Sequence, residues 1–417
     1  MRDRNSRRVV ITGLGVVAPN GIGKDAFWEN LIAGKSAVDY ITAFDASPYP
    51  CQVAAEVRNF RPEDLMTKKQ ARELWRFTQF AVAAARMSVD DAKLDIGARN
   101  AETLAACFGT CINGFEKIEE SYEMVFRGKG YTGLHPLTCF QYSTHAPVSY
   151  VTIDLGIRGP SMTLASGCST GLDVIKWGYD QIQEGSVTAV IAGSTEAPLT
   201  SLAFSTFCAL GILTKATNPN RASRPYDLNR DGIVLGEGAG AVVIESLESA
   251  LDRGAPIYAE VSGYGLSSEA LHLRKREESG TSLAQAIRLA IASAGTTPEG
   301  IDYINSHGNS MPESDRNETT GFKRALGQRA YSIPVSSIKS MIGQPIAASG
   351  ILQAISAALS VRHDVIPPTI NYETPDPDCD LDYVPNHARV SRVNRVLIDA
   401  HAVGGTHSTL ILEKVAT

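Results

Sequence analysis

The chain has 417 residues, of which 43% are hydrophobic, and its formal net charge is −6. This length and apolar content suffice for a large core, and for two of them. The negative net charge argues against nucleic acid as a partner. The first eight residues are polar, without an apolar signal-peptide core, and no run approaches the length of a membrane span. We therefore expect a cytoplasmic protein that binds neither nucleic acid nor a membrane.

The cysteines do not have the paired spacing of a disulfide framework or a zinc site. There are seven of them: Cys51, Cys107, Cys111, Cys139, Cys168, Cys208 and Cys379. An odd number without CxxC pairs argues against both kinds of site. Cys107 and Cys111 are four residues apart, but no nearby His or Cys completes a metal-binding set. The sequence therefore predicts no bound metal.

Residues 9–17 form the first predicted element, a buried strand that leads into a turn with Gly13 and Gly15. Two such glycines are typical of dinucleotide-binding turns. However, the next residues include Pro19 and do not open a helix with a third glycine at the required place. This pattern therefore does not predict a dinucleotide site.

A comparable strand and turn returns at residues 258–265. After each copy, strand patterns such as 187–192 and 396–400 alternate with helical patterns such as 281–294. Two similar α/β halves with a joint near residues 246–256 fit this layout. We place the domain boundaries at residues 1–250 and 251–417.

The segment 164–171 reads Leu-Ala-Ser-Gly-Cys-Ser-Thr-Gly and carries Cys168 between a strand pattern and a helix pattern. A thiol at a helix N-terminus feels the positive end of the peptide dipoles, which favours the thiolate. The small neighbouring residues leave room for an incoming thioester. The alternative is a buried structural cysteine in a glycine-rich turn.

Three later segments are candidates to converge on this cysteine. His307 follows the strand pattern 301–304 in a polar loop, a placement typical of a catalytic imidazole. The alternative is a capped loop histidine. The segment 336–344, with Lys339, again joins a strand to a small-residue helix. The segment 399–407 contains a Gly-Gly turn whose backbone N–H groups could face an oxyanion.

With these four segments in order, the chain resembles the β-ketoacyl-[acyl carrier protein] synthases of the thiolase superfamily, of the elongating type used in fatty acid and type II polyketide assembly. The resemblance runs essentially end to end and includes residues 8–18, 157–163, 223–240 and 371–386. It implies an α/β, thiolase-like, five-layered αβαβα fold built from two duplicated halves. The first half would carry the nucleophilic cysteine, and the second the catalytic histidine and the glycine-rich loop.

The resemblance also implies a role for each matching residue. Cys168 would take the acyl chain from the phosphopantetheine of an acyl carrier protein, so that no cofactor is bound by the chain itself. The backbone N–H groups of Cys168 and Val403 would form the oxyanion hole. His307 would assist decarboxylation of a malonyl thioester and stabilise the enolate. Lys339 would organise the site, and Glu318 would support it.

One departure affects the chemistry directly: Gln344 stands where the family has a second histidine in Lys-Ser-x-x-Gly-His. A neutral carboxamide can still donate a hydrogen bond to the malonyl thioester carbonyl, although it cannot exchange protons. Decarboxylative Claisen condensation is therefore the leading expectation. The alternatives are an acyltransferase or thioesterase-like variant that forms only the acyl-cysteine, and a non-catalytic subunit that shapes a partner's pocket.

The glycine-rich loop departs as well, because the family reads Asn-Ser-Phe-Gly-Phe-Gly-Gly-Thr-Asn there. Its two ring positions hold His401 and Val403 in this chain. Losing both rings opens volume beside the cysteine, which suggests a bulkier, stiffer or more polar acyl chain. His401 either supplies an ionisable group in place of the missing imidazole or fills space. The expected pocket and gating residues are His401, Val403, Gly404, Gly405, Phe204 and Met311.

Acyl carrier proteins are acidic, so the resemblance implies a locally basic docking surface. Cations at helical spacing within residues 67–80 fit this expectation, although a solvated helix face is the alternative: Lys68, Lys69, Arg72 and Arg76. The resemblance also implies a dimer. The partner would be a second copy or a chain-length-factor-like paralogue that lacks the cysteine, in which case this chain is the active member.

Overall fold

The computed structural model describes residues 7–415 except 274 and 276. Within this part of the chain the central sheet has 11 strands, ten of them in one continuous order. From edge to edge these are β12 (Val335–Ser336), β11 (Tyr303–Asn305), β15 (Arg395–His401), β16 (Thr406–Glu413), β10 (Ala259–Ser268), β1 (Val9–Ala18), β9 (Gly238–Ser246), β7 (Ala189–Glu196), β5 (Leu104–Gly109) and β6 (Ser161–Leu164). The short β2 (Gly21–Ile22) pairs with β1.

The two ends of this sheet repeat one another. In the first half, β9 is antiparallel to both β1 and β7, while β5 is parallel to β7 and β6. In the second half, β16 is antiparallel to β10 and β15, while β11 is parallel to β15 and β12. Even the irregularities match, because the register shifts between Ile11 and Gly13 in β1 and between Val261 and Gly263 in β10. The halves are joined where β1 pairs with β10.

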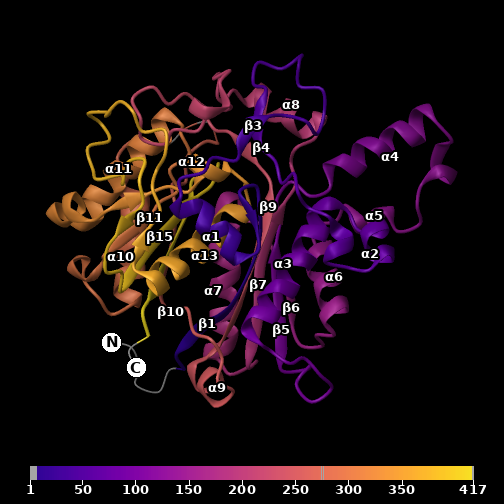
Figure 1. Ribbon diagram of the computed structural model, residues 1–417, viewed down its shortest axis with the longest axis horizontal. Coiled ribbons are helices and arrows are strands. Elements are labelled where there is room, and N and C mark those ends of the chain that lie inside the picture. The colour runs from indigo at the N-terminus through magenta and orange to yellow at the C-terminus, as the bar shows by residue number, and fades with distance from the viewer. Residues whose placement is uncertain (1–6, 274, 276, 416–417) are drawn as a thin grey trace.

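Helices cover both faces of each half and produce five layers, which Figure 1 shows from left to right. The outer helices of the second half are α10 (Thr281–Ser293) and α11 (Pro312–Leu326), and those of the first half are α3 (Arg76–Ala92) and α6 (Ala146–Leu155). Between the halves lie α7 (Thr170–Gln183) and α13 (Ala348–His363), which pack against each other. The predicted αβαβα fold is confirmed.

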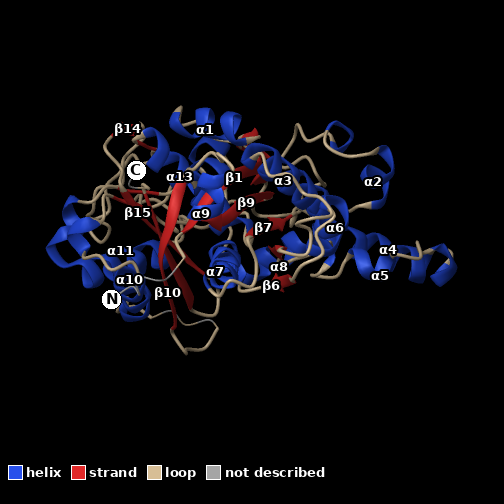
Figure 2. Cartoon of the chain, turned by 90° about the horizontal axis from the view of Figure 1, so that it is seen from below, coloured by secondary structure: helices blue, strands red, loops and turns tan. Residues whose placement is uncertain are grey.

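The remaining elements lie around these layers. The helices are α1 (Lys24–Ile32), α2 (Lys68–Glu73), α4 (Phe115–Arg127), α5 (Thr138–Gln141), α8 (Ser201–Leu210), α9 (Leu247–Asp252) and α12 (Lys339–Ile342). The further strands are β3 (Val38–Tyr40), β4 (Val53–Ala55), β8 (Leu235–Gly236), β13 (Val365–Ile366) and β14 (Arg389–Val390). Figure 2 shows α4 projecting from one end of the molecule. Among the described residues, none of the helices combines the length and the apolar character that a bilayer crossing needs.

The predicted strands and the predicted helix agree with these elements. The glycine turns expected after the two strands are wrong, because Gly13 and Gly15 lie inside β1 and Gly263 and Gly265 lie inside β10. The strand predicted at residues 9–17 is β1, and the helix predicted at 281–294 is α10. The repeat of the first strand near residue 260 is β10. Helix α9 lies at the joint between the halves, and the boundary at residue 250 remains a prediction.

The repeated glycines at the start of each half allow a helix to lie very close to a strand. A Cβ atom at Gly15 in β1 would collide with the carbonyl oxygen of Ala84 in α3. A Cβ atom at Gly265 in β10 would collide in the same way with Ala286 in α10. These glycines therefore serve strand–helix packing, which explains why they do not open a dinucleotide-binding turn.

Replacing Gly15 with alanine should destabilise the fold, because the obstacles are the Ala84 carbonyl oxygen and the Ser88 backbone N–H, neither of which can rotate away. We expect Gly15→Ala to lower the free energy of unfolding by about 1–3 kcal/mol or more, measured by urea denaturation. The control is Gly97→Ala, where a Cβ meets nothing within 4 Å and the change should stay within about 0.5 kcal/mol. Equal stability of the two variants would contradict this explanation.

Candidate active site

Cys168 lies in a 3-10 turn (Gly167–Ser169) that runs directly into α7. The Thr170 hydroxyl fixes this turn, because it accepts from the Ser166 N–H at 2.9 Å and donates to the Gly167 carbonyl oxygen at 2.7 Å. The cysteine is half-buried. Its position at the start of a buried helix is the one predicted from the sequence, and the helix dipole there favours a negative charge.

The first turn of α7 crosses the first turn of α13 at very close range. A Cβ atom at Gly171 would collide with the backbone of Gly350 and Ile351. This contact requires the small residues that the sequence shows at 347–350. It places the cysteine turn of the first half against the helix that follows Gln344 in the second half.

His307 lies in the loop between β11 and α11 and is buried. A single carboxyl group holds its backbone: Glu318 accepts from the His307 N–H at 2.6 Å and from the Gly308 N–H at 2.9 Å. The Tyr226 hydroxyl donates to the same carboxyl group at 2.6 Å. The predicted supporting role of Glu318 therefore has a geometric basis in these three hydrogen bonds.

Two donors face the ring of His307. The backbone N–H of His401 donates to Nδ1 at 3.3 Å, and the amide nitrogen of Asn309 lies 3.2 Å from Nε2. A neutral imidazole accepts at only one nitrogen. The backbone N–H can only donate, so we assign the acceptor role to Nδ1 and the proton to Nε2. Asn309 Nδ2 then has to turn away, which breaks the 3.1 Å hydrogen bond from the Met311 N–H to Asn309 Oδ1. Sequence analysis missed Asn309, although it lies only two residues after His307.

Lys339 is buried and ties these groups together. Its Nζ donates to the His307 carbonyl oxygen at 2.6 Å and to Gln353 Oε1 at 3.1 Å. Burial lowers the pKa of Lys339 to about 8, and the negative charges of Glu318 and of an ionised Cys168 oppose that shift. The ammonium group is thus within electrostatic range of the sulfur. Gln353 is a further residue that sequence analysis missed.

Two buried carboxyl groups lie near this lysine. Burial, followed by the charge of Asp399, raises the pKa of Glu318 well above its usual value. Burial also raises the pKa of Asp399 to about 6, although the Glu318 carboxyl and the charge of Lys339 oppose this. Asp399 stands where the family loop begins with asparagine. This substitution is the signal in the sequence from which Asp399 could have been identified as a site residue.

Gln344 is buried between α12 and α13, with its backbone paired to that of Val234 and Gly236. The Ser349 hydroxyl donates to its side-chain Oε1 at 3.2 Å. Because the amide oxygen is engaged in this way, Nε2 is the atom that remains to donate to a substrate. This arrangement agrees with the expected donor role.

The glycine-rich loop is a tight turn after β15, closed by hydrogen bonds between Ala402 and Thr406 and between Gly405 and Ala402. Gly404 and Gly405 have φ values of 102° and 81°, which favour glycine. A Cβ atom at Gly167 would meet Ala402 Cβ at 2.6 Å, so this turn touches the cysteine turn. Val403, the residue after Ala402 in the glycine-rich turn, is 53% exposed. Its N–H and that of Cys168 therefore belong to neighbouring turns, and the oxyanion hole remains a prediction.

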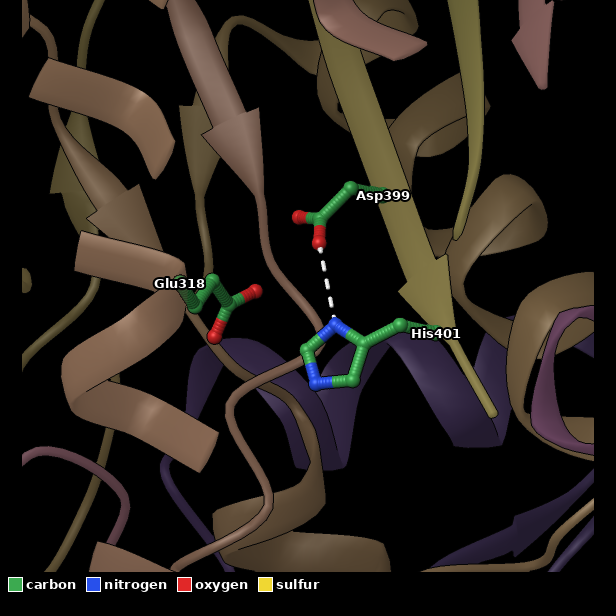
Figure 3. Close-up of side chains that lie close together, drawn as sticks. All are labelled: Glu318, Asp399 and His401. Atoms are coloured by element: carbon green, nitrogen blue, oxygen red, sulfur yellow. Dashed lines mark ion pairs between the residues drawn. The ribbon is translucent and has the colours of Figure 1, made fainter. Parts of the chain in front are cut away.

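The side chain of His401 lies elsewhere than expected. Its ring is buried against that of His307, with centroids 3.9 Å apart and planes tilted by 35°. Its Nε2 lies 2.9 Å from the Ser314 hydroxyl, and its Nδ1 lies 3.7 Å from Asp399 (Figure 3). These polar partners hold the His401 ring in the interior. A phenylalanine ring at this position would need no such partners.

Phe204 and Met311 do share an apolar cluster with the cysteine. Phe204 in α8 is fully buried and packs against Phe44 and Tyr49, with ring centroids 5.3 and 5.4 Å away. Half-buried Cys168 and Met311 pack against the same cluster. The structure therefore brings these predicted pocket residues together, while their roles toward a substrate remain predictions.

The single basic helix face expected at residues 67–80 is wrong, because the chain breaks between α2 and α3. Lys68, Lys69 and Arg72 are exposed on α2. Arg76 begins α3, and its guanidinium donates to Glu237 at 2.6 and 2.8 Å and to the Val57 carbonyl oxygen. The Arg76 guanidinium is thus paired within the chain, although its side chain is 36% exposed, and its role in docking remains a prediction.

Two family models match the chain. The model described as Beta-ketoacyl synthase, N-terminal domain, matches residues 6–250, and the model described as Beta-ketoacyl synthase, C-terminal domain, matches residues 258–373. The tetracenomycin polyketide synthase ketoacyl synthase alpha subunit of Streptomyces glaucescens is 43% identical over 98% of this chain and 97% of its own. The 3-oxoacyl-[acyl-carrier-protein] synthase 2 of Coxiella burnetii is 40% identical over 98% and 99%.

Solved structures give the same result. A ketosynthase assembly described as a type II polyketide synthase acyl-carrier protein in complex with its ketosynthase bound to the hexaketide is 32% identical, with a TM-score of 0.91 over 99% of this chain and 100% of that one. The ishigamide ketosynthase/chain length factor is 34% identical, with a TM-score of 0.92 over 99% and 100%. Since both halves match and the relatives cover nearly the whole chain, it belongs to the beta-ketoacyl synthase family.

Proposed function

We propose that this chain is a condensing ketosynthase of type II polyketide or fatty acid-like biosynthesis. It takes an acyl chain onto Cys168 and joins it to a malonyl-carrier unit by decarboxylative Claisen condensation. The observation that carries the proposal is the convergence on one place of the cysteine at the start of α7, the imidazole of His307, and the ammonium group of Lys339 that donates to the histidine backbone. The relatives are ketosynthases of these two pathways by name.

In the first step the Cys168 thiolate attacks the thioester carbonyl of the carrier-bound acyl group. The oxygen that becomes negative receives hydrogen bonds from the backbone N–H groups of Cys168 and Val403. The carbon–sulfur bond to the carrier then breaks, and its thiolate leaves with the proton that the cysteine gave up. Preorganised donors of this kind each contribute about 3–4 kcal/mol to stabilising the transition state.

In the second step the malonyl carbon–carboxylate bond breaks and carbon dioxide leaves. The enolate oxygen accepts hydrogen bonds from His307 Nε2–H and from the amide of Gln344. The enolate carbon attacks the acyl carbonyl, the new carbon–carbon bond forms, and the Cys168 thiolate is expelled. No step requires a proton from position 344, so a carboxamide suffices there. Acyl transfer without condensation is the second candidate, and the neutral Gln344 side chain is the observation that favours it.

The substrates arrive on the phosphopantetheine of an acyl carrier protein, and no bound cofactor takes part in these steps. The exposed cations of α2 support a docking surface for this acidic partner (Lys68, Lys69 and Arg72). One of the similar solved structures contains a ketosynthase with its acyl-carrier protein. A cytoplasmic location, expected from the sequence, remains a prediction.

The arm at residues 115–142, which projects at the right of Figure 1, supports a second subunit as partner. Its helix α4 buries no residue, and its large side chains are open to solvent: Phe126 is 71% exposed and Tyr131 is 81% exposed. Large exposed apolar surfaces mark sites of protein association. We propose that the arm packs on a second copy or on a chain-length-factor-like paralogue. This chain, which retains Cys168, is then the active member.

The proposed chemistry is tested by intact-mass spectrometry with acyl and malonyl carrier proteins. The native chain should gain the acyl mass, release carbon dioxide and yield a product extended by two carbons. Cys168→Ala should lose acylation entirely, because the sulfur that forms the thioester is gone. An acyl-enzyme that forms without carbon dioxide or extension would contradict condensation and favour acyl transfer.

Gln344 should matter for condensation and not for loading. Gln344→Ala removes a donor to the enolate, so condensation should slow by about 10²–10³-fold while the rate of Cys168 acylation is kept. Ser349→Ala is the matched control, because it only frees the amide oxygen and should have a much smaller effect. Single-turnover assays separate the two steps. If both rates of Gln344→Ala equal those of the native chain, the amide is not the donor.

Charge reversal on α2 should weaken carrier docking. Lys68→Glu combined with Lys69→Glu should raise the KM for the carrier-bound substrate severalfold, and the effect should shrink at high salt because exposed charges are screened. Arg99→Glu, an exposed cation in the loop after α3, serves as the control for a charge reversal elsewhere on the surface. If both variants raise the KM equally, the α2 cations are not a docking site.

A further inference from the structure

Three buried side chains of the second half point to a metal site behind His307. One ligand atom each from Glu318, Asp399 and His401 lie within 4.8 Å of one another. Figure 3 shows Asp399 and His401 projecting from the end of one strand toward Glu318 on the facing helix. The three residues are 1%, 0% and 5% exposed. The two strand residues are departures from the family loop, which has asparagine and phenylalanine there.

The carboxylate of Asp399 is the independent sign that a ligand belongs here. Among the described residues, neither of its oxygens accepts a hydrogen bond. A hydrogen bond to the nearby carboxyl of Glu318 would need a proton on one of the two groups. Burying a carboxylate without donors is costly, and buried charges in proteins are paired or coordinate metals.

One cation lies near the two carboxyl groups of the cluster. Glu318 and Asp399 carry two carboxyl groups, while Lys339 supplies one ammonium group within electrostatic range of both. The nearby guanidinium of Arg230 is engaged with other carboxylates, at Asp376 and Asp315. With both carboxyl groups ionised, the cluster has room for one further positive charge.

The remaining geometry suits a cation. Glu318 Oε1 accepts one hydrogen bond and keeps a lone pair, because the Gly308 N–H and the Tyr226 hydroxyl both donate to Oε2. The Ser314 hydroxyl lies 2.9 Å from His401 Nε2, and Nδ1 is the ring nitrogen on the side of Asp399, 3.7 Å from its carboxylate. A partner on one imidazole nitrogen is the usual way in which metal-binding histidines are oriented.

A cavity of about 10 Å³ adjoins the cluster and is lined by Glu318 and His401, together with Ser314, His407 and Glu269. This volume holds about one water molecule. Three protein ligands and one water are the usual coordination of an open zinc site, whereas magnesium prefers oxygen ligands alone in an octahedral arrangement.

We propose that Glu318, Asp399 and His401 bind one divalent cation of the zinc class, with a water as the fourth ligand. The ion neutralises the two carboxylates and orients the His401 ring, which lies against the His307 ring. It touches no substrate and takes no part in the condensation steps. Cysteine spacing, on which the expectation of no metal was based, carries no information about such a site.

The test measures zinc in the full-length chain without any substrate, so its result is independent of condensation activity. The chain is stripped with a chelator, incubated with Zn²⁺, passed through gel filtration and analysed by mass spectrometry of the metal. We expect one equivalent in the native chain and none in Asp399→Asn or His401→Phe. Both variants install the residue of the family pattern and should therefore fold. His407→Asn also installs the family residue, lines the same cavity outside the ligand set, and should retain zinc.

Cobalt gives a second measurement that needs no variant. Co²⁺ added to the stripped native chain should produce the visible absorption bands of a four-coordinate site, and Zn²⁺ should displace them. A native chain that emerges from gel filtration without zinc, or that shows no such bands, would overturn the proposal and leave a proton as the balancing charge. Retention of zinc by both Asp399→Asn and His401→Phe would overturn the assigned ligands.

Discussion

The carboxyl group of Glu318 holds the loop on which the candidate chemistry depends. It accepts from the N–H groups of His307 and Gly308 and from the Tyr226 hydroxyl, so one buried group fixes two consecutive backbone positions. Desolvation makes this arrangement expensive, as the raised pKa of Glu318 shows. Lys339 offsets part of that cost with its charge and donates to the His307 carbonyl oxygen from the other side. The imidazole is therefore oriented through its backbone before any substrate arrives.

The fold brings the cysteine to this loop by very close packing between the halves. The first turns of α7 and α13 meet at Gly171 and Gly350, where no side chain fits. The glycine-rich turn touches the cysteine turn from the second half in the same way, through Ala402 and Gly167. Hydrogen bonds thus fix the position of His307, whereas close packing at glycines fixes the position of the Cys168 sulfur. The proposed condensation needs both, because an enolate held at one place has to reach a thioester held at the other.

Sequence patterns predicted the structural features that depend on residues close together in the chain. The strand at 9–17, the helix at 281–294 and the turn at Cys168 followed from periodicity and small residues, and the family resemblance supplied the layers. The basic helix face failed for a non-local reason: no glycine or proline marks the break at residues 74–75, and Arg76 is drawn to Glu237, 161 positions away in sequence. The cluster of Glu318, Asp399 and His401 was missed because it joins residues from two elements that only the tertiary structure brings together. Likewise, nothing in the sequence distinguishes Asn309 and Gln353. Their importance follows only from their contacts with His307 and Lys339 in the folded structure.

The duplication also constrains how such an enzyme can evolve. Each half has the same strand order and the same bulge, so the two look interchangeable as modules. The glycine crossing of α7 and α13 shows that they are not, because a half inherited from another lineage must bring a matching gap at that crossing. Recombination at the α9 joint is therefore productive only between parents that share this crossing.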